Sequence, residues 1–298
     1  MKYKQLGKSN LHISNIGFGC MSLKEDYAAL DKLVNRAIEH GINYFDTADI
    51  YDFGINEIEL GKALKPFRKK IFIATKGGNQ PKAEGNDWTW NPTKAYIMKA
   101  CEESLKRLKT DYIDLYQLHG GTIDDPIDET IEAFETLQQQ GKIRQYGISS
   151  IRPNVIREYV KKSNIVSVMM QYSLLDRRPE EECLDYLQEH KVGVLARGSV
   201  AGGLLIDKPT KEYLGYKGEE VEAMANAVGN LSGRHRTKAQ TAIQFVLKYQ
   251  AVTAAVAGIR TLSQLEEATQ TLQAEPLTLQ EYIQLQSVLP VNKYKEHR

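Results

Sequence analysis

The feature that most constrains the fold is a regular alternation of short apolar runs with longer amphipathic stretches. Each of eight apolar runs has the composition of a buried strand, and a segment with apolar residues at helical spacing follows it. Parallel strands need crossover helices of this kind, so the pattern predicts an α/β fold with a parallel sheet. The expected strands are residues 16–19, 42–45, 71–74, 113–118, 144–149, 166–171, 192–196 and 253–257. The expected helices are residues 26–40, 57–64, 93–108, 127–140, 153–161, 179–190, 237–249 and 262–273.

Eight strand–helix units without a long polar linker favour a closed TIM barrel, a single (β/α)8 domain over residues 1–298. A doubly wound open sheet stays open as the alternative, because periodicity does not distinguish an open sheet from a closed one. Three segments lie outside the eight units. We expect a hairpin at 2–14 that caps the N-terminal end of the barrel, a long insertion at 206–236, and an additional helix beyond Leu279.

Charge and composition exclude several classes of function. The net charge is +1, with 39 basic and 38 acidic residues mixed along the chain, so we expect no nucleic-acid or membrane partner. No apolar run approaches the ~20 residues of a membrane span, and no signal core follows Met1. The three cysteines are far apart, which predicts neither a disulfide framework nor a zinc site. We therefore expect a cytoplasmic protein without a bound metal.

Polar residues follow most of the expected strands directly. The carboxyl ends of all eight strands of a barrel surround one mouth, where barrel enzymes place their active sites. Side chains at these positions are therefore expected to lie close together although they are distant in the sequence. The residues concerned are Asp46, Tyr51, Lys76, His119, Ser149 and Gln171.

Four of these residues suit proton transfer to a carbonyl oxygen. A lysine beside a tyrosine favours the phenolate and should lower the pKa of Tyr51 from about 10. Asp46 would keep the Lys76 ammonium charged and oriented, and His119 would donate a hydrogen bond to a polarised oxygen. The accompanying hydride needs a cofactor, because no side chain supplies one. Any one of the four, taken alone, is more typical of a surface or loop-capping residue.

The motifs around these residues resemble those of the aldo-keto reductases. The resemblance extends over nearly the whole chain, and among the subgroups it is greatest to bacterial general-purpose reductases. It rests on Lys4–Ser9 with Ile16–Met21, Gly41–Ala48 with Tyr51, Ser104–Leu108 with Asp111–His119, and Gly141–Arg144 with Gly147–Ser149.

The resemblance implies a catalytic tetrad and a nicotinamide cofactor, NADPH/NADP+ in preference to NADH. Tyr51 would be the proton donor, Lys76 and Asp46 the pair that tunes it, and His119 the residue that orients the substrate carbonyl. Contacts to the nicotinamide, the phosphates and the adenosine end are implied for the loops that follow strands five to eight. These cofactor-binding positions are Ser149, Ser150, Gln171, Arg197, Gly198, Gly203, Gly258, Arg260, Gln264 and Glu267.

The chain departs from the family pattern at several of these positions. Ser150 stands where an asparagine is usual, and Arg197 stands where an aromatic side chain often stacks on the nicotinamide. Gln264 and Ala268 replace an arginine and an asparagine, which predicts weaker contacts at the adenine end. We expect Arg197 to tune cofactor binding, because it adds a positive charge beside a ring that is itself positive when oxidised.

The resemblance also implies that the substrate is a small carbonyl compound. Aromatic and apolar side chains in the strand-end loops either wall a substrate pocket or pack the loops against the barrel. The candidates are Met21, Phe53, Trp88 and Trp90. Two other kinds of function are alternatives for such a barrel: a catalytically slow nicotinamide sensor or regulatory subunit, and a metal-dependent barrel hydrolase. The second would need a ligand cluster, for which only His119 and Asp46 are at strand ends.

Overall fold

A closed barrel of parallel strands forms the centre of the molecule in the computed structural model, which describes residues 1–23, 27, 30–82 and 87–298. The strand order is β10-β11-β12-β3-β4-β5-β8-β9. This closure confirms the predicted (β/α)8 barrel and contradicts the open-sheet alternative. The strands are β3 (Ile16–Gly19), β4 (Tyr44–Asp46), β5 (Phe72–Gly77), β8 (Ile113–Leu118), β9 (Ile143–Ser149), β10 (Ser167–Gln171), β11 (Gly193–Arg197) and β12 (Val252–Gly258).

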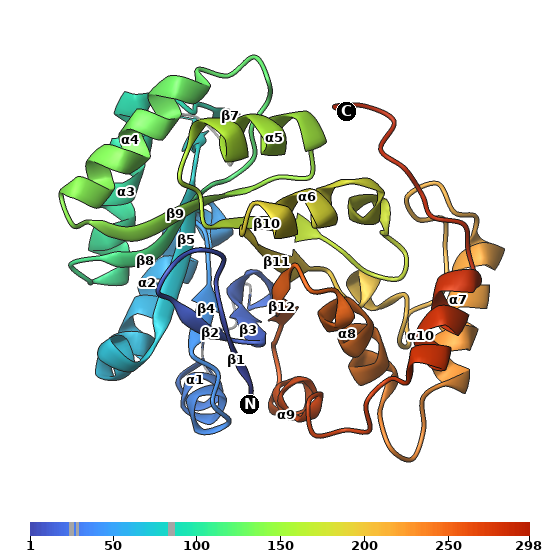
Figure 1. The fold of residues 1–298 in the computed structure, drawn as a ribbon. Helices are drawn as coiled ribbons and strands as arrows, with labels where there is room; N and C mark the ends of the chain where they lie inside the picture. Colours follow the sequence, from blue (N-terminus) through green and yellow to red (C-terminus); the bar gives the residue numbers. More distant parts are fainter. Residues whose placement is uncertain (24–26, 28–29, 83–86) are drawn as a thin grey trace.

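Helices surround the strands, as Figure 1 shows in a view along the barrel. Each packs buried residues against the outside of the sheet. Several begin at a threonine whose hydroxyl caps the first turn, as Thr93 does for α3. Residues 26, 28 and 29 of the first expected helix lie outside the described residues. The helices are α1 (Leu30–Glu39), α2 (Ile55–Leu64), α3 (Lys94–Leu108), α4 (Ile127–Gln139), α5 (Pro153–Lys162), α6 (Cys183–Glu189), α8 (Lys238–Lys248) and α9 (Leu262–Gln270).

An antiparallel hairpin, β1 (Tyr3–Gln5) and β2 (His12–Ser14), closes one end of the barrel as predicted. Leu6 and Ile13 are fully buried among inward-facing strand residues. Gly7 lies at φ +55°, and a Cβ there would come within 2.2 Å of a carbonyl oxygen in the barrel wall, so the turn requires glycine. The opposite mouth is thereby left open to ligands.

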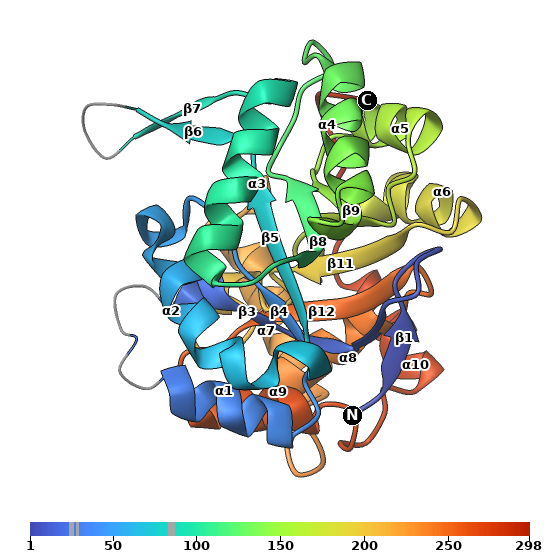
Figure 2. The ribbon, with the colours of Figure 1, turned by 90° about the vertical axis from the view of Figure 1, so that its left-hand side faces the viewer.

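The sequence did not predict two elements, and one expected helix is divided. A short hairpin of β6 (Asn79–Pro81) and β7 (Trp88–Trp90) projects beside α3, away from the barrel (Figure 2). The insertion contains α7 (Gly218–Asn230), which packs with α10 (Leu279–Ser287) outside α8. The stretch expected to be one helix at 179–190 is a 3-10 turn followed by α6, because the backbone at Glu182 (φ −157°) interrupts it.

Candidate active site

Lys76 stands at the centre of the barrel mouth and is completely buried. It lies on β5, and its ammonium nitrogen donates to Asp46 Oδ1 at 2.6 Å and to the carbonyl oxygen of Thr47 at 2.7 Å. A longer hydrogen bond of 3.4 Å runs from the same nitrogen to the Tyr51 hydroxyl. An ammonium has three protons, so these contacts account for its full donor capacity. Lys76 therefore connects the carboxylate to the phenol directly.

Backbone contacts with β5 fix the segment that carries the tyrosine. The amide of Thr47 donates to Ala74 O at 2.9 Å, and the amide of Asp49 donates to Lys76 O at 3.2 Å. The hydroxyl of Thr47 also donates to Asn56 Oδ1 at 2.7 Å, which ties this segment to α2. Tyr51 thus lies on a rigid connection between strand and helix.

The chain turns sharply immediately after Tyr51. Asp52 and Phe53 adopt φ values of 49° and 50°, and Gly54 follows at 86°. Non-glycine residues in this left-handed region are strained, and such strain is concentrated at functional sites. The turn lets the chain enter α2 at once, with the phenol directed back toward the barrel.

His119 follows β8 and faces the same phenol. Its ring meets that of Tyr51 edge to face, with centroids 5.9 Å apart. Burial lowers the pKa of His119 to about 3, and the charges of Lys76 and Arg197 act in the same direction. At neutral pH the imidazole is therefore uncharged and carries a single N–H donor. Its Nδ1 atom is buried without a hydrogen-bond partner in the described part of the protein.

The pKa of Tyr51 differs from the sequence-based expectation. Burial raises it above its ordinary value, and the opposing effect of Lys76 does not overcome that shift. The expectation of a lowered pKa was wrong because it considered the ammonium without the cost of burying a phenolate. Tyr51 is consequently a protonated phenol at neutral pH.

Burial and neighbouring charges also shift the pKa values of Asp46 and Lys76, the buried ion pair beneath the tyrosine. Burial raises the pKa of Asp46, while Lys76 opposes the shift. Burial alone would lower the pKa of Lys76, but Asp46 and Tyr51 raise it above its usual value. The lysine is therefore a fixed positive charge below the tyrosine.

A cavity of about 430 Å³ opens above these groups. Tyr51, Lys76 and His119 lie in its wall, and so do Ser149 and Ser150 from the end of β9. Asp46 lies behind Lys76 and is 4% exposed. The structure thus brings together the four residues that the sequence singled out, together with three of the expected cofactor-binding residues, Ser149, Ser150 and Arg197.

Gln171 and Arg197 occupy adjacent strand ends beside this cavity, where β10 pairs with β11. Arg197 lines the cavity and donates to Gln171 Oε1 at 3.5 Å. The amide nitrogen of Gln171 donates to the hydroxyl of Tyr213 at 2.5 Å. Tyr213 comes from the insertion, and no sequence signal pointed to it. The insertion therefore reaches the edge of the mouth.

The remaining expected cofactor positions continue across the ends of β11 and β12. Gly198 and Gly203 follow β11 with φ values of 71° and 100°, a conformation that favours glycine, and the Lys208 side chain lies beside Gly203. Gly258 ends β12 and is exposed, as is Arg260 two residues later. Gln264 accepts a hydrogen bond from the Arg260 amide at 3.0 Å. Glu267 is half-buried on α9, where its carbonyl oxygen accepts from Gln240.

Of the four expected substrate residues, Met21 lies in the wall of the barrel-mouth cavity, where it is 58% exposed. Phe53 and Trp88 line a different cavity, of about 590 Å³, beside α3. Trp90 donates from its indole nitrogen to Asp125 Oδ1 at 2.9 Å and covers glycines of two strand-end loops. The contacts of Trp90 are those of a residue that packs a loop against the barrel.

Besides Tyr213, sequence reasoning missed two polar residues at the mouth. Gln117 donates to Asp46 Oδ2 at 3.4 Å and lies two positions before His119. The two-residue period of a strand places both on one face, so this position was available from the pattern. Arg152 lines the cavity from the loop after β9, and no motif marks it.

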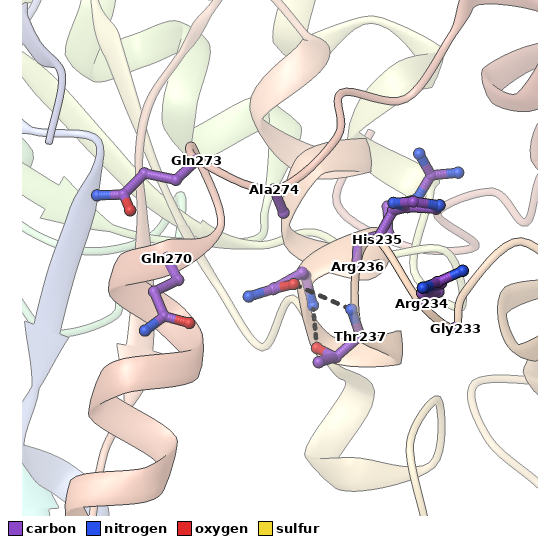
Figure 3. A pocket seen from close by; sticks show the side chains of 9 residues that line it. Gly233, Arg234, His235, Arg236, Thr237, Gln270, Gln273 and Ala274 are labelled. Carbon is purple, nitrogen blue, oxygen red and sulfur yellow. Dashed lines mark hydrogen bonds between the residues drawn. The ribbon is translucent and has the colours of Figure 1, made fainter.

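A further cavity, of about 320 Å³, lies between the start of α8 and the end of α9 (Figure 3). Thr237 and Gln240 line it, but they bond to each other in a capping box. Arg236 is buried there and pairs with Glu281. No tyrosine, cysteine or carboxylate lines this cavity in the described part of the chain. The barrel mouth is the candidate active site because Tyr51, Lys76 and His119 meet there.

The chain matches the Aldo/keto reductase family model over residues 15–290. It belongs to the aldo/keto reductase family, a family of oxidoreductases. It is 50% identical to the uncharacterized oxidoreductase YqkF of Bacillus subtilis (strain 168), with 100% of each chain covered.

Solved structures of an aldo-keto reductase are also similar. The holo form of aldo-keto reductase AKR11C1 from Bacillus halodurans has a TM-score of 0.94 at 50% identity and covers 100% of this chain and 99% of its own. The apo form of the same protein has a TM-score of 0.86 at 48% identity, with the same coverage.

Two structural absences complete the description of this family member. Among the described residues, no group of three or more His, Cys, Asp or Glu side chains is arranged to hold a metal ion. None of the helices in the described part of the chain has the length and apolar character of a membrane span.

Proposed function

We propose that this protein reduces aldehydes or ketones to alcohols with NADPH as the reductant, using Tyr51 as the general acid. One observation carries the proposal: the buried Lys76 ammonium contacts both the Asp46 carboxylate and the Tyr51 hydroxyl. The phenol and the neutral imidazole of His119 meet in the wall of the same cavity. A carbonyl group placed there has a proton donor and a hydrogen-bond donor within reach.

The residues at the mouth fit a nicotinamide cofactor. Ser149 and Arg197 line the cavity, and the adjacent Gln171 offers an amide at the next strand end. These three would hold the nicotinamide, with Ser150 beside them. Gly198 and Gly203 lack side chains, which suits the close approach of phosphate groups. The greater similarity to the holo form of AKR11C1 than to its apo form supports the same assignment.

The adenosine end would lie at the loop after β12. Arg260 is exposed there, and its guanidinium offers a planar set of donors to a 2′-phosphate. Gly258 precedes it, and Gln264 and Glu267 follow on α9. The side-chain oxygen of Gln264 already accepts a hydrogen bond from the Arg260 backbone amide. The guanidinium of Arg260 is therefore the main group proposed to bind the 2′-phosphate, which NADPH has and NADH lacks.

The bound reduced nicotinamide would supply the hydride that the carbonyl carbon receives. Tyr51 donates its phenolic proton to the carbonyl oxygen as charge develops there, so hydride and proton together give the alcohol. Lys76 stabilises the phenolate that remains, through the hydrogen bond to the hydroxyl oxygen. Asp46 holds that ammonium charged, and the N–H of His119 orients the carbonyl oxygen.

A substrate panel tests the proposal. Purified protein is mixed with NADPH and a series of aldehydes, and the loss of NADPH absorbance is followed with and without a chelator. We expect aldehyde-dependent oxidation of NADPH that the chelator does not change. A nicotinamide sensor would bind NADPH without turnover, and loss of activity with the chelator would indicate metal chemistry. Either of these two results would contradict the proposal.

A further inference from the structure

The cavity above Tyr51 has an unbalanced charge. Among the described residues that line it, none is aspartate or glutamate, whereas lysine and arginine side chains occur on opposite sides. The Lys76 charge is balanced from behind by Asp46. The proposed function assigns Arg197 to the cofactor. The guanidinium of Arg152 is then a positive charge in the wall without an assigned role.

Arg152 is held in position from one side. It precedes α5, and its amide donates to the hydroxyl of Ser150 at 3.2 Å. One terminal nitrogen of its guanidinium donates to the carbonyl oxygen of Gly121. In the described part of the chain no carboxylate lies at ion-pair distance from this guanidinium. It is therefore fixed by a neutral acceptor, and its remaining donors are available to a ligand.

A second cavity, of about 400 Å³, adjoins the first, and both have Ile151 and Arg152 in their walls. This second cavity is lined by Lys293 and Lys295 from the C-terminal segment, which pairs with the start of α5 through a hydrogen bond from Asn154 N to His297 O. Figure 1 shows the C-terminus on the same side of the barrel as α5 and α6. Glu296 lies in the same wall, and Lys293 is 3.8 Å from Glu181, so the charges of this second cavity are partly balanced. A molecule that extends from Tyr51 in this direction meets Arg152 first.

The wall also has an apolar part. Met21, Ile50, Ile151 and Met169 line the same cavity as the reacting groups and the guanidinium. A substrate that fills this space would have an apolar body, with its carbonyl at one end and its charged group at the other. A single guanidinium with free donors matches the planar geometry of a carboxylate.

We propose that the preferred substrates are carbonyl compounds that bear a carboxylate on an apolar body, and that Arg152 binds this carboxylate while the carbonyl lies at Tyr51 and His119. The inference rests on the proposed function, because it concerns the substrate of that reaction. Arg152 determines specificity here and takes no part in proton transfer.

A matched pair of aldehydes tests the inference. 4-Formylbenzoate and its methyl ester share the ring and the reacting carbonyl, but only the first is charged. The ester withdraws electrons more strongly, so intrinsic reactivity favours the neutral compound. We expect kcat/KM with NADPH to be at least tenfold higher for the carboxylate, which corresponds to about 1.4 kcal/mol. Added salt should reduce this preference, because screening weakens an accessible charge pair.

Variants at Arg152 identify the source of the preference. Arg152→Gln should lower the ratio of the two kcat/KM values at least tenfold, whereas Arg152→Lys should keep most of it. Lys161→Gln removes a positive charge from exposed surface on the same helix, outside both cavities, and should leave the ratio unchanged. Calorimetric titration of the reaction product, 4-(hydroxymethyl)benzoate, should show weaker binding to Arg152→Gln, independently of turnover.

The results separate failure of the inference from failure of the proposed function. If the wild type reduces the ester as well as or better than the carboxylate, or if Arg152→Gln keeps the wild-type ratio, the inference is overturned and the reductase remains. If neither aldehyde is reduced, nor any member of the wider panel, both are overturned.

Discussion

The buried ion pair below the tyrosine gives a quantitative prediction for stability. Lys76→Met removes the ammonium and keeps the shape of the side chain, which leaves the Asp46 carboxylate 4% exposed and without its cation. The hydrogen bonds that remain to it, from Gln117 and Tyr44, are long at 3.4 and 3.5 Å. Removing one partner of a buried ion pair typically lowers the free energy of unfolding by about 3–5 kcal/mol.

The cost should depend on pH, because the carboxyl of Asp46 can avoid burying a charge by binding a proton. The carboxyl of an unfolded aspartate has a pKa of about 3.9. Keeping it protonated costs about 1.4 kcal/mol for each pH unit above that value. Keeping Asp46 protonated in folded Lys76→Met therefore costs about 4 kcal/mol at pH 7 and about 1.5 kcal/mol at pH 5. The folded variant holds a proton that the unfolded chain has released, so its stability falls as pH rises between these values.

The assay is urea unfolding of the wild type, Lys76→Met and the double variant Asp46→Asn/Lys76→Met at pH 5 and pH 7. The double variant buries no charge at this site, so it should be more stable than the single variant at pH 7, with a cost that no longer changes with pH. The reasoning is refuted if Lys76→Met loses the same stability at both pH values, or if the double variant is as unstable at pH 7 as the single one.

Two further predictions concern charges near the site. Arg197→Tyr removes a positive charge beside the proposed nicotinamide position, so it should strengthen binding of NADP+ relative to NADPH by several-fold in fluorescence titrations; unchanged affinities and turnover would exclude a role for Arg197 in tuning the cofactor. Burial and the neighbouring Glu57 raise the pKa of Asp49 to about 8, and its Oδ1 has no hydrogen-bond partner within the described protein. A raised carboxyl pKa lowers stability as pH rises from about 4 to about 8, by at most about 1.4 kcal/mol per unit. Asp49→Asn should therefore be more stable than the wild type at pH 8, and equal thermal midpoints would contradict this.

The sequence predicted the barrel because its strands are apolar on both faces and its helices are amphipathic, and both patterns are local. It also located Tyr51, Lys76 and His119, because barrel topology converts positions after strands into neighbours in space. The family resemblance implied the roles that are proposed for them. In the structure Lys76 contacts both Asp46 and Tyr51, so these residues are neighbours as their positions after the strands predicted.

Sequence reasoning failed where the outcome depends on long-range packing. The pKa of Tyr51 is set by burial as well as by its neighbour, and burial is a property of the whole mouth. For Trp88 and Trp90 the sequence left two interpretations open, a substrate pocket or loop packing, because it does not show the hairpin that places Trp88 beside α3 and Trp90 on loop glycines. Arg152 and Tyr213 reach the mouth from loops without any periodic signal.

The central claim is that the Tyr51 phenol delivers the proton to the substrate. The direct test compares the wild type with Tyr51→Phe in the same preparation, measuring NADPH affinity by fluorescence and the rate of aldehyde reduction in a single turnover. We expect NADPH affinity to stay close to the wild-type value while the reduction rate falls by about 10²–10⁴ or more, the range typical of a lost general acid. Reduction at the wild-type rate in Tyr51→Phe would contradict the account.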